Sequence, residues 1–152
     1  VVILSKGMVE NHIGRDKIKL HQEWIDAYKI LTPKAAESGG LNNRILGKCY
    51  LADSGKCCNG TYIVIGPFTD KETALVTNKY LYTKFCRFLI AMKKNTQDLK
   101  DQTFSIVPLQ NFTSKSDIDW SKSVSEIDHQ LYTKYGLTEK EISFIESMIK
   151  EM

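Results

Sequence analysis

The stretch TYIVIGPFTDKETALVTNKYLYTKFCRFLIAMKKNTQDLKDQTFSIVPLQ, residues 61–110, decides the fold. Residues 61–65 are β-branched or aromatic, which is typical of a strand, and Gly66-Pro67 is expected to end it. Residues 103–107 alternate apolar and polar side chains and predict a second short strand that ends at Pro108. The stretch therefore predicts two strands on either side of a helix.

One long helix is expected between these strands, from a cap at Thr69 or Asp70 to about Lys94. Such a helix spans ~37 Å at 1.5 Å per residue. Its apolar positions recur at three- and four-residue spacing and define one face, made by 74, 75, 81, 85, 88, 89 and 92. Phe85 and Phe88 on this face are expected to anchor the core.

Two further strands are expected upstream, at residues 1–4 and 28–31. Pro33 cannot donate to a strand ladder, so pairing is expected to stop there. Ser-Lys-Gly follows the first strand and Pro-Lys-Ala the second. Both patterns place a lysine, Lys6 or Lys34, just past a strand end.

Loops are expected over residues 35–60, which are rich in Gly, Ser, Asn and Asp and hold a hairpin at most. Residues 8–23 are polar, with only a weak helical pattern. A loop of this length in a compact domain is often functional. Asn42, Asn43 and Arg44 carry side chains that can pair with base edges. An ordinary surface loop is the alternative for each of them.

The C-terminal part predicts a pair of helices. The first covers about 124–135, with Gly136 as its C-cap, and the second follows a capping box formed by Thr138 and Glu141. The predicted fold class is α+β, with a small mixed or antiparallel sheet packed on one long helix and a C-terminal helical pair. Residues 1–110 form the expected body and 111–152 an expected helical appendage.

Charge is distributed unevenly along the chain. The 152 residues carry a net charge of +3, with 42% hydrophobic and 26% charged residues. Residues 1–60 and 61–110 each carry +3, whereas 111–152 carry −3. A basic body suits a polyanionic partner, although +6 over 110 residues is also compatible with ordinary variation.

Cysteine usage and the apolar runs limit the remaining classes. Cys49, Cys57, Cys58 and Cys86 include no C-x-x-C pair, so reduced, partly buried thiols are expected rather than a zinc site or disulfides. No apolar run is long enough for a transmembrane helix, and the N-terminus lacks a signal-peptide pattern. An apolar run from Val1 is typical of a strand within a longer chain, so we expect a fragment of a larger enzyme.

No active-site motif is present in the sequence. There is no nucleophile elbow, no P-loop and no dinucleotide-binding glycine pattern. The Asp/Asn-Pro-Pro-Tyr/Phe tetrad of adenine-specific DNA methyltransferases and nuclease motifs of the Pro-Asp…Glu-x-Lys type are also missing. Asp117 and Asp119 form a small acidic cluster that is typical of a solvated loop. The chain itself is therefore expected to be non-catalytic and to bind no metal.

Six segments resemble the C-terminal region of bacterial type II restriction–modification enzymes, which are adenine-specific DNA methyltransferases that are in some cases fused to an endonuclease. The segments are LSKG at 4–7, WIDAYKILTPKA at 24–35, GTYIVIGPFTDKETA at 60–74, YLYTKFCRFLIAMKKNTQ at 80–97, FSIVPLQNF at 104–112, and DIDWSKSVSEIDHQLYTKYGLTEKEISFIESMIKEM at 117–152. Cys86 departs from the pattern, because that family usually has an aromatic residue there.

This resemblance implies a target-recognition domain that docks on double-stranded DNA and selects the sequence to be methylated. Catalysis, S-adenosylmethionine binding and any magnesium-dependent cleavage would lie in the upstream methyltransferase domain or a fused nuclease, outside this chain. The resemblance also implies a cytoplasmic protein with no membrane partner. Lys and Arg side chains would contact phosphates, and a few loop side chains would read bases in the major groove.

The DNA-binding candidates lie next to strand ends, in the long loop, and along the predicted long helix. They are Lys6, Arg15, Lys34, Asn42, Asn43, Arg44, Lys84, Arg87, Lys93, Lys94 and Gln97. Two alternatives remain open at this point. The chain could be a protein-interaction module that docks on the methyltransferase core or a partner subunit, or it could carry an unfamiliar enzyme site.

Overall fold

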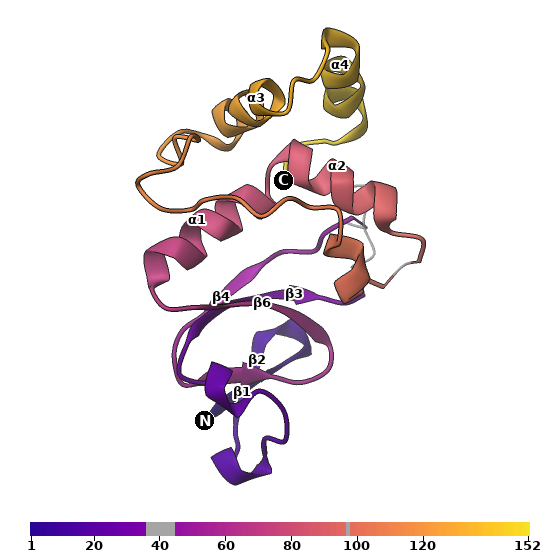
Figure 1. Ribbon diagram of the computed structural model, residues 1–152. Coiled ribbons are helices and arrows are strands. Elements are labelled where there is room, and N and C mark those ends of the chain that lie inside the picture. The colour runs from indigo at the N-terminus through magenta and orange to yellow at the C-terminus, as the bar shows by residue number, and fades with distance from the viewer. Residues whose placement is uncertain (36–44, 97) are drawn as a thin grey trace.

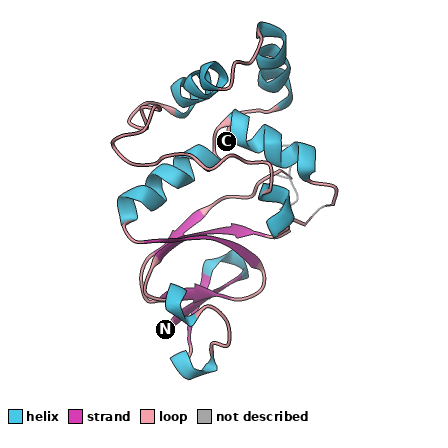
Figure 2. Cartoon of the chain, viewed as in Figure 1, coloured by secondary structure: helices cyan, strands magenta, loops and turns pink. Residues whose placement is uncertain are grey.

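The computed structural model of the chain describes residues 1–35, 45–96 and 98–152 (Figure 1). The predicted α+β class is confirmed: the described residues form two three-stranded sheets and four α-helices. Strands gather with short 3₁₀ helices at one end of the molecule, and the four α-helices lie toward the other (Figure 2). The strands are β1 Val2–Ser5, β2 Val9–His12, β3 Tyr28–Pro33, β4 Tyr50–Ala52, β5 Lys56–Cys58 and β6 Tyr62–Phe68, and the helices are α1 Lys71–Leu81, α2 Lys84–Lys93, α3 Val124–Lys134 and α4 Glu139–Met148.

The first sheet has the strand order β2-β1-β5. β1 pairs antiparallel with β2 and parallel with β5, so this sheet is mixed. The polar segment 8–23 was expected to have a weak helical pattern. Instead it supplies β2 and short 3₁₀ turns, because β1 offers its open edge to residues that have no strand signal of their own.

The second sheet has the order β4-β3-β6, and all its pairs are antiparallel. Leu4 of the first sheet packs in one small apolar cluster with Leu31, Ala52 and Tyr62 of the second. β4 and β5 lie next to each other in the sequence but join different sheets. The described residues 45–60 therefore do not form a simple hairpin, since β4 and β5 belong to different sheets, and residues 36–44 lie outside the described part of the chain.

The two prolines in the second sheet have different outcomes. β3 ends at Pro33, as predicted; Pro33 lies opposite Tyr62, and the next amide, that of Lys34, donates to the carbonyl of Thr61 at 2.9 Å. Pro67, in contrast, lies inside β6 rather than ending it, contrary to prediction. β6 continues past Gly66 to Phe68, with a shift of register opposite Tyr28. Proline has no backbone N–H to donate to a strand ladder. A strand end and an irregular, bulge-like position both tolerate this lack.

The predicted single long helix is two helices, α1 and α2. Thr83 separates them with extended backbone angles of −63° and 147°, and its hydroxyl accepts a hydrogen bond from the amide of Cys86. The same hydroxyl donates to the carbonyl of Tyr80 at 2.7 Å. Thr83 thus ends one helix and caps the next, as threonine does at helix starts. The cap of α1 is Asp70, as predicted.

Residues 103–107 do not form the predicted strand. The 3₁₀ helix η5, Asp101–Phe104, occupies this region and packs against α2 rather than beside a sheet. The hydroxyl of buried Thr103 accepts a hydrogen bond from the amide of Lys100 at 3.1 Å. The apolar alternation covered too few residues to distinguish a strand from a turn that buries Phe104.

The two C-terminal helices are confirmed. Ser123 caps α3 in a capping box with Glu126, and Thr138 caps α4 in the predicted box with Glu141. Gly136 has a φ of 63° and follows α3. Its left-handed conformation is the reason that glycine suits this position.

One continuous core joins α1 and α2 to the C-terminal helices. It contains Phe85 and Ile90 of α2 together with Ile127 and Leu131 of α3 and Ile145 of α4. Residues 111–152 therefore pack on the same apolar core as the rest of the chain.

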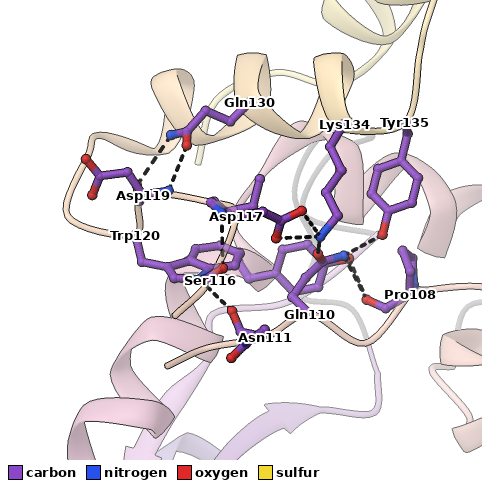
Figure 3. A network of polar contacts seen from close by, with 12 residues as sticks. Pro108, Gln110, Asn111, Ser116, Asp117, Asp119, Trp120, Gln130, Lys134 and Tyr135 are labelled. Atoms are coloured by element: carbon purple, nitrogen blue, oxygen red, sulfur yellow. Dashed lines mark hydrogen bonds and ion pairs between the residues drawn. The ribbon is translucent and has the colours of Figure 1, made fainter. Parts of the chain in front are cut away.

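A polar network holds the segment before α3 against that helix (Figure 3). The side-chain amide of Gln110 donates to the hydroxyl of Tyr135 at 2.8 Å, and its oxygen accepts from Lys134 at 2.9 Å. The Lys134 ammonium also reaches Asp117, and the amide of Asp119 donates to the side chain of Gln130. Asp117 and Asp119, the acidic cluster singled out in the sequence, thus fasten a loop.

Candidate functional site

The described basic candidates fall into three separate places. Lys6 directly follows β1, Lys34 directly follows β3, and Lys93 and Lys94 lie where α2 ends. Lys84 and Arg87 lie at the opposite end of α2. Arg15 lies beyond the far ends of β1 and β2. Asn42, Asn43, Arg44 and Gln97 lie outside the described residues.

Tyr62 connects the two strand-exit lysines. Its hydroxyl donates to the carbonyl of Ser5 at 3.1 Å and accepts from the amide of Met8 at 3.2 Å, so it holds the turn that carries Lys6. Tyr62 is also the residue opposite Pro33, immediately before Lys34. One buried side chain thus links both predicted lysine positions.

Lys34 is tied in turn to the exit of α2. Its carbonyl accepts from the amide of Leu99 at 2.8 Å, and Ala35 forms a bridge with Asp98. Lys93, Asp98 and Lys100 line one shallow hollow of about 150 Å³. Lysines from a strand end and a helix end therefore meet around one short segment.

The side chain of Lys94 points toward Ile45. Its ammonium lies 3.5 Å from the carbonyl of Ile45, and burial lowers its pKa, with Asp98 opposing the shift. Lys6, Lys34, Lys93 and Lys100 are exposed, whereas Lys94 is half-buried. We call these five lysines, Lys6, Lys34, Lys93, Lys94 and Lys100, the basic end. Asp98 and Asp101 are the acidic side chains nearest along the chain to Lys93, Lys94 and Lys100.

The sequence reasoning missed Lys100 and Tyr62. Lys100 follows the Lys93-Lys94 pair after a short polar segment, and only the bridge between Ala35 and Asp98 brings it beside Lys34. Tyr62 has the sequence pattern of an ordinary strand residue. No local pattern indicates that its hydroxyl reaches a turn more than fifty positions away.

Arg15 does not belong to the basic end. Its guanidinium forms an ion pair with Asp26 and donates to the carbonyl of Gln22 at 3.2 Å. The pair lies on the surface, where such contacts contribute little stability. The hydrogen bond and charge of Asp26 raise the pKa of Arg15, which therefore remains a paired cation.

Arg87, a predicted surface contact, is instead buried, with 1% of its surface exposed. Its Nε donates to the carbonyl of Tyr82 at 3.2 Å. Burial lowers the pKa of Arg87 and nearby Asp128 opposes this effect, and arginine stays protonated at neutral pH in any case. Lys84 at the same end of α2 forms an ion pair with Glu146. Neither residue is available to a partner at the basic end.

Two of the cysteines lie near these charged groups, Cys58 near Lys34 and Cys86 near Arg87. All four are free thiols; Cys49 and Cys86 are buried, and Cys57 and Cys58 are partly exposed. Burial raises the pKa of Cys58 to about 11, so this thiol is protonated at neutral pH and a poor nucleophile. Within residues 1–35, 45–96 and 98–152, no group of three or more His, Cys, Asp or Glu side chains is placed to hold a metal ion.

No helix in the described parts of the chain has both the length and the apolar character needed to cross a membrane. Comparison with family models, with curated proteins and with solved structures finds no match for this chain. The site must therefore be interpreted from its own geometry.

Proposed function

We propose that the chain is a duplex-DNA recognition domain of a bacterial restriction–modification enzyme. The observation that carries the proposal is the basic end: Tyr62 links the positions of Lys6 and Lys34, Lys34 is hydrogen-bonded to Leu99, and Lys93 and Lys100 line one hollow beside that segment. A rigid element that presents several exposed ammonium groups suits a phosphate backbone, which attracts cations irrespective of sequence. The resemblance of six segments to target-recognition regions supports the same function.

In this proposal the chain selects DNA and performs no catalysis. The methyltransferase domain with its S-adenosylmethionine, and any nuclease with its magnesium, would lie outside these residues and contact this domain as a partner. The enzyme would work in the bacterial cytoplasm. The buried or ion-paired state of Arg87, Lys84 and Arg15 removes them from the proposed contact set.

The test measures binding of the 152-residue chain to a labelled random-sequence duplex over a range of salt concentrations. Log K is expected to fall linearly with log salt, with a slope of about −0.9 for each phosphate contacted. Replacing Lys34 or Lys100 with Ala should weaken binding and make the slope less steep by about 0.9 per lost contact. Both side chains are exposed, so stability should not change.

The matched controls are Lys122→Ala and Lys140→Ala, which remove the same charge from exposed positions in the acidic C-terminal part. Their salt slopes should equal that of the unmodified chain. Binding without salt dependence, or an equal effect of all four substitutions, would overturn the assignment of the basic end.

A second candidate function is docking of the methyltransferase core. An apolar groove of about 470 Å³ lies between α2 and α4 and includes Phe88, Met92 and Phe144. Met92 is 63% exposed and Phe144 is 56% exposed, which is unusual for side chains of this size on one groove. Charge reversal of Lys34 in the full-length enzyme separates the two functions. Loss of methylation favours DNA recognition, and unchanged methylation favours docking.

A further inference from the structure

A pocket of about 620 Å³ opens at the end of α2 that is opposite the basic end. The first turns of α2 and α3 and the last residues of the chain surround it. Its lining includes Lys48, Lys84, Arg87, Val124, Ser125 and Asp128. The pocket is lined by Lys84 and Arg87 in the first turn of α2, whereas Lys93 is the last residue of that helix, so an inference about this pocket does not depend on the proposed DNA contact.

Arg87 lines this pocket and has one unsatisfied hydrogen-bond donor. Only 1% of the residue is exposed, and its Nη1 has no hydrogen-bond partner among the residues that the structure describes. Leaving a buried charged donor without an acceptor is strongly unfavourable. A guanidinium in this state is suited to an acceptor supplied from outside the chain, above all a carboxylate.

The neighbouring charges are already engaged. The carboxylate of Asp128 accepts from the amides of Lys84 and Phe85 at 2.9 and 2.8 Å, which satisfies the first turn of α2. Glu146 accepts from Lys84 and from the hydroxyl of Tyr132. None of the ion pairs found among the described residues includes Arg87, so these carboxylates leave it unpaired.

The first turn of α3 supplies further donors at the same place. Ser123 and Glu126 satisfy each other in the capping box, which uses the amides of those two residues. The amides of Val124 and Ser125, the first two residues of α3, have no acceptor within their own helix. The positive end of the helix dipole adds to the attraction for an anion at this position.

We propose that this pocket binds the carboxylate of a small organic acid, with Arg87 and the first turn of α3 as its ligand-binding groups. Three cationic and three acidic side chains line the pocket, namely Lys48, Lys84, Arg87, Asp128, Glu146 and Glu151. This balance favours a single negative charge over the two charges of a phosphate. Tyr82, Val124 and Met152 provide apolar walls for the body of the ligand.

Benzoate is the probe, and binding to the 152-residue chain is followed by amide and Arg Nε chemical shifts. Saturable changes at Arg87, Val124 and Ser125 are expected, with a Kd of about 1 mM. Benzamide, which has the same shape without the charge, and inorganic phosphate should each bind at least about tenfold more weakly.

Ser125→Glu tests the location without removing the buried arginine. A glutamate in the first turn of α3 suits the helix dipole, so the variant should fold, and its carboxylate should compete for the same donors. Benzoate affinity should fall about tenfold or more in Ser125→Glu and stay within about threefold in the neutral control Ser125→Gln.

Three results would overturn the proposal. They are no saturable binding of benzoate up to about 50 mM, equal affinity for benzamide or phosphate, and unchanged benzoate affinity in Ser125→Glu.

Discussion

The Oδ1 atom of Asp128 accepts a hydrogen bond from the backbone amide of Phe85 at 2.8 Å. Asp128 is on α3 and Phe85 is in the first turn of α2, so one helix caps the other across 43 residues of sequence. Only 2% of Asp128 is exposed. The contact fixes the two helices relative to each other where the C-terminal part of the chain meets the body.

Protonation of Asp128 is expected to change stability between pH 4 and 6. Burial raises the pKa of this carboxyl to about 6, although the amides of Phe85 and Lys84 oppose the shift. The unfolded chain loses the proton near the ordinary value of 3.8, so the folded state binds more protons in this interval. The contribution of Asp128 to the free energy of unfolding therefore falls as pH rises, by about 3 kcal/mol in total.

Urea denaturation of the unmodified chain and Asp128→Asn at several pH values measures this contribution. The difference between the two unfolding free energies should decrease from pH 4 to 6 and remain constant above pH 7. Asp119→Asn is the contrasting control. Hydrogen bonds from Ser121 lower the pKa of exposed Asp119, so its contribution should instead be largely retained from pH 4 to 6 and be lost as pH falls below the ordinary value of 3.8. If the difference in unfolding free energy between the unmodified chain and Asp128→Asn does not change with pH, the raised pKa of Asp128 is contradicted.

Phe85 is expected to be a main anchor of the core. It is 5% exposed, and its ring stacks on Tyr135 with centroids 4.9 Å apart. Phe85→Ala should lower the free energy of unfolding by about 3–5 kcal/mol, because it leaves a cavity between α2 and α3. Leu109, which is 91% exposed, provides the control, and Leu109→Ala should change stability by less than about 0.5 kcal/mol. Equal losses in the two variants would refute the role of Phe85.

Gly66 is expected to be required by the backbone of β6. Its φ is 138°, and a Cβ atom there would lie 3.2 Å from Cδ2 of Phe68. Gly66→Ala should therefore destabilise the fold by about 1–3 kcal/mol. A Cβ atom at Gly60 would meet no other atom within 4 Å, and Gly60 has no positive φ, so Gly60→Ala should be nearly neutral. Thermal unfolding of both variants checks this prediction. Unchanged stability of Gly66→Ala would show that the backbone of β6 does not require glycine there.

Local signals in the sequence were sufficient for the fold class and the helix caps. Asp70, one of the two candidates for its helix, and Thr138 cap the helices as their positions predict, because capping depends only on residues within one turn. The break at Thr83 was missed since the apolar face continues across it. The partner of the α2 amides, Asp128, lies far along the chain, and no local pattern indicates such a tertiary cap.

The candidate site was predicted only in part for the same reason. Lysines after strand ends are visible in the sequence, and the structure places Lys6 and Lys34 in such positions. Arg87 follows a helical spacing that gives no indication of burial, because its neighbours on α3 and at the C-terminus cover it. Lys100 reaches the same end through a bridge formed by Ala35 and Asp98, which only the fold creates.

Tyr62 is expected to hold the turn that carries Lys6. Its hydroxyl makes two hydrogen bonds, with the carbonyl of Ser5 and the amide of Met8, and both are lost in Tyr62→Phe. The variant should lose about 1–2 kcal/mol of stability. Exchange of the Met8 amide with solvent should become faster, because this amide then lacks its acceptor.

Tyr82→Phe is the matched control for this prediction, because the hydroxyl of Tyr82 also makes two bonds, with the amide and carbonyl of Cys49. It should cost a similar amount of stability while leaving exchange at Met8 unchanged. If exchange of the Met8 amide becomes faster by the same factor in both variants, the turn opens only through global unfolding. Tyr62 then has no local role. Selective acceleration in Tyr62→Phe means that Tyr62 positions Lys6 at the basic end independently of overall stability, and duplex binding should then weaken in this variant and not in Tyr82→Phe.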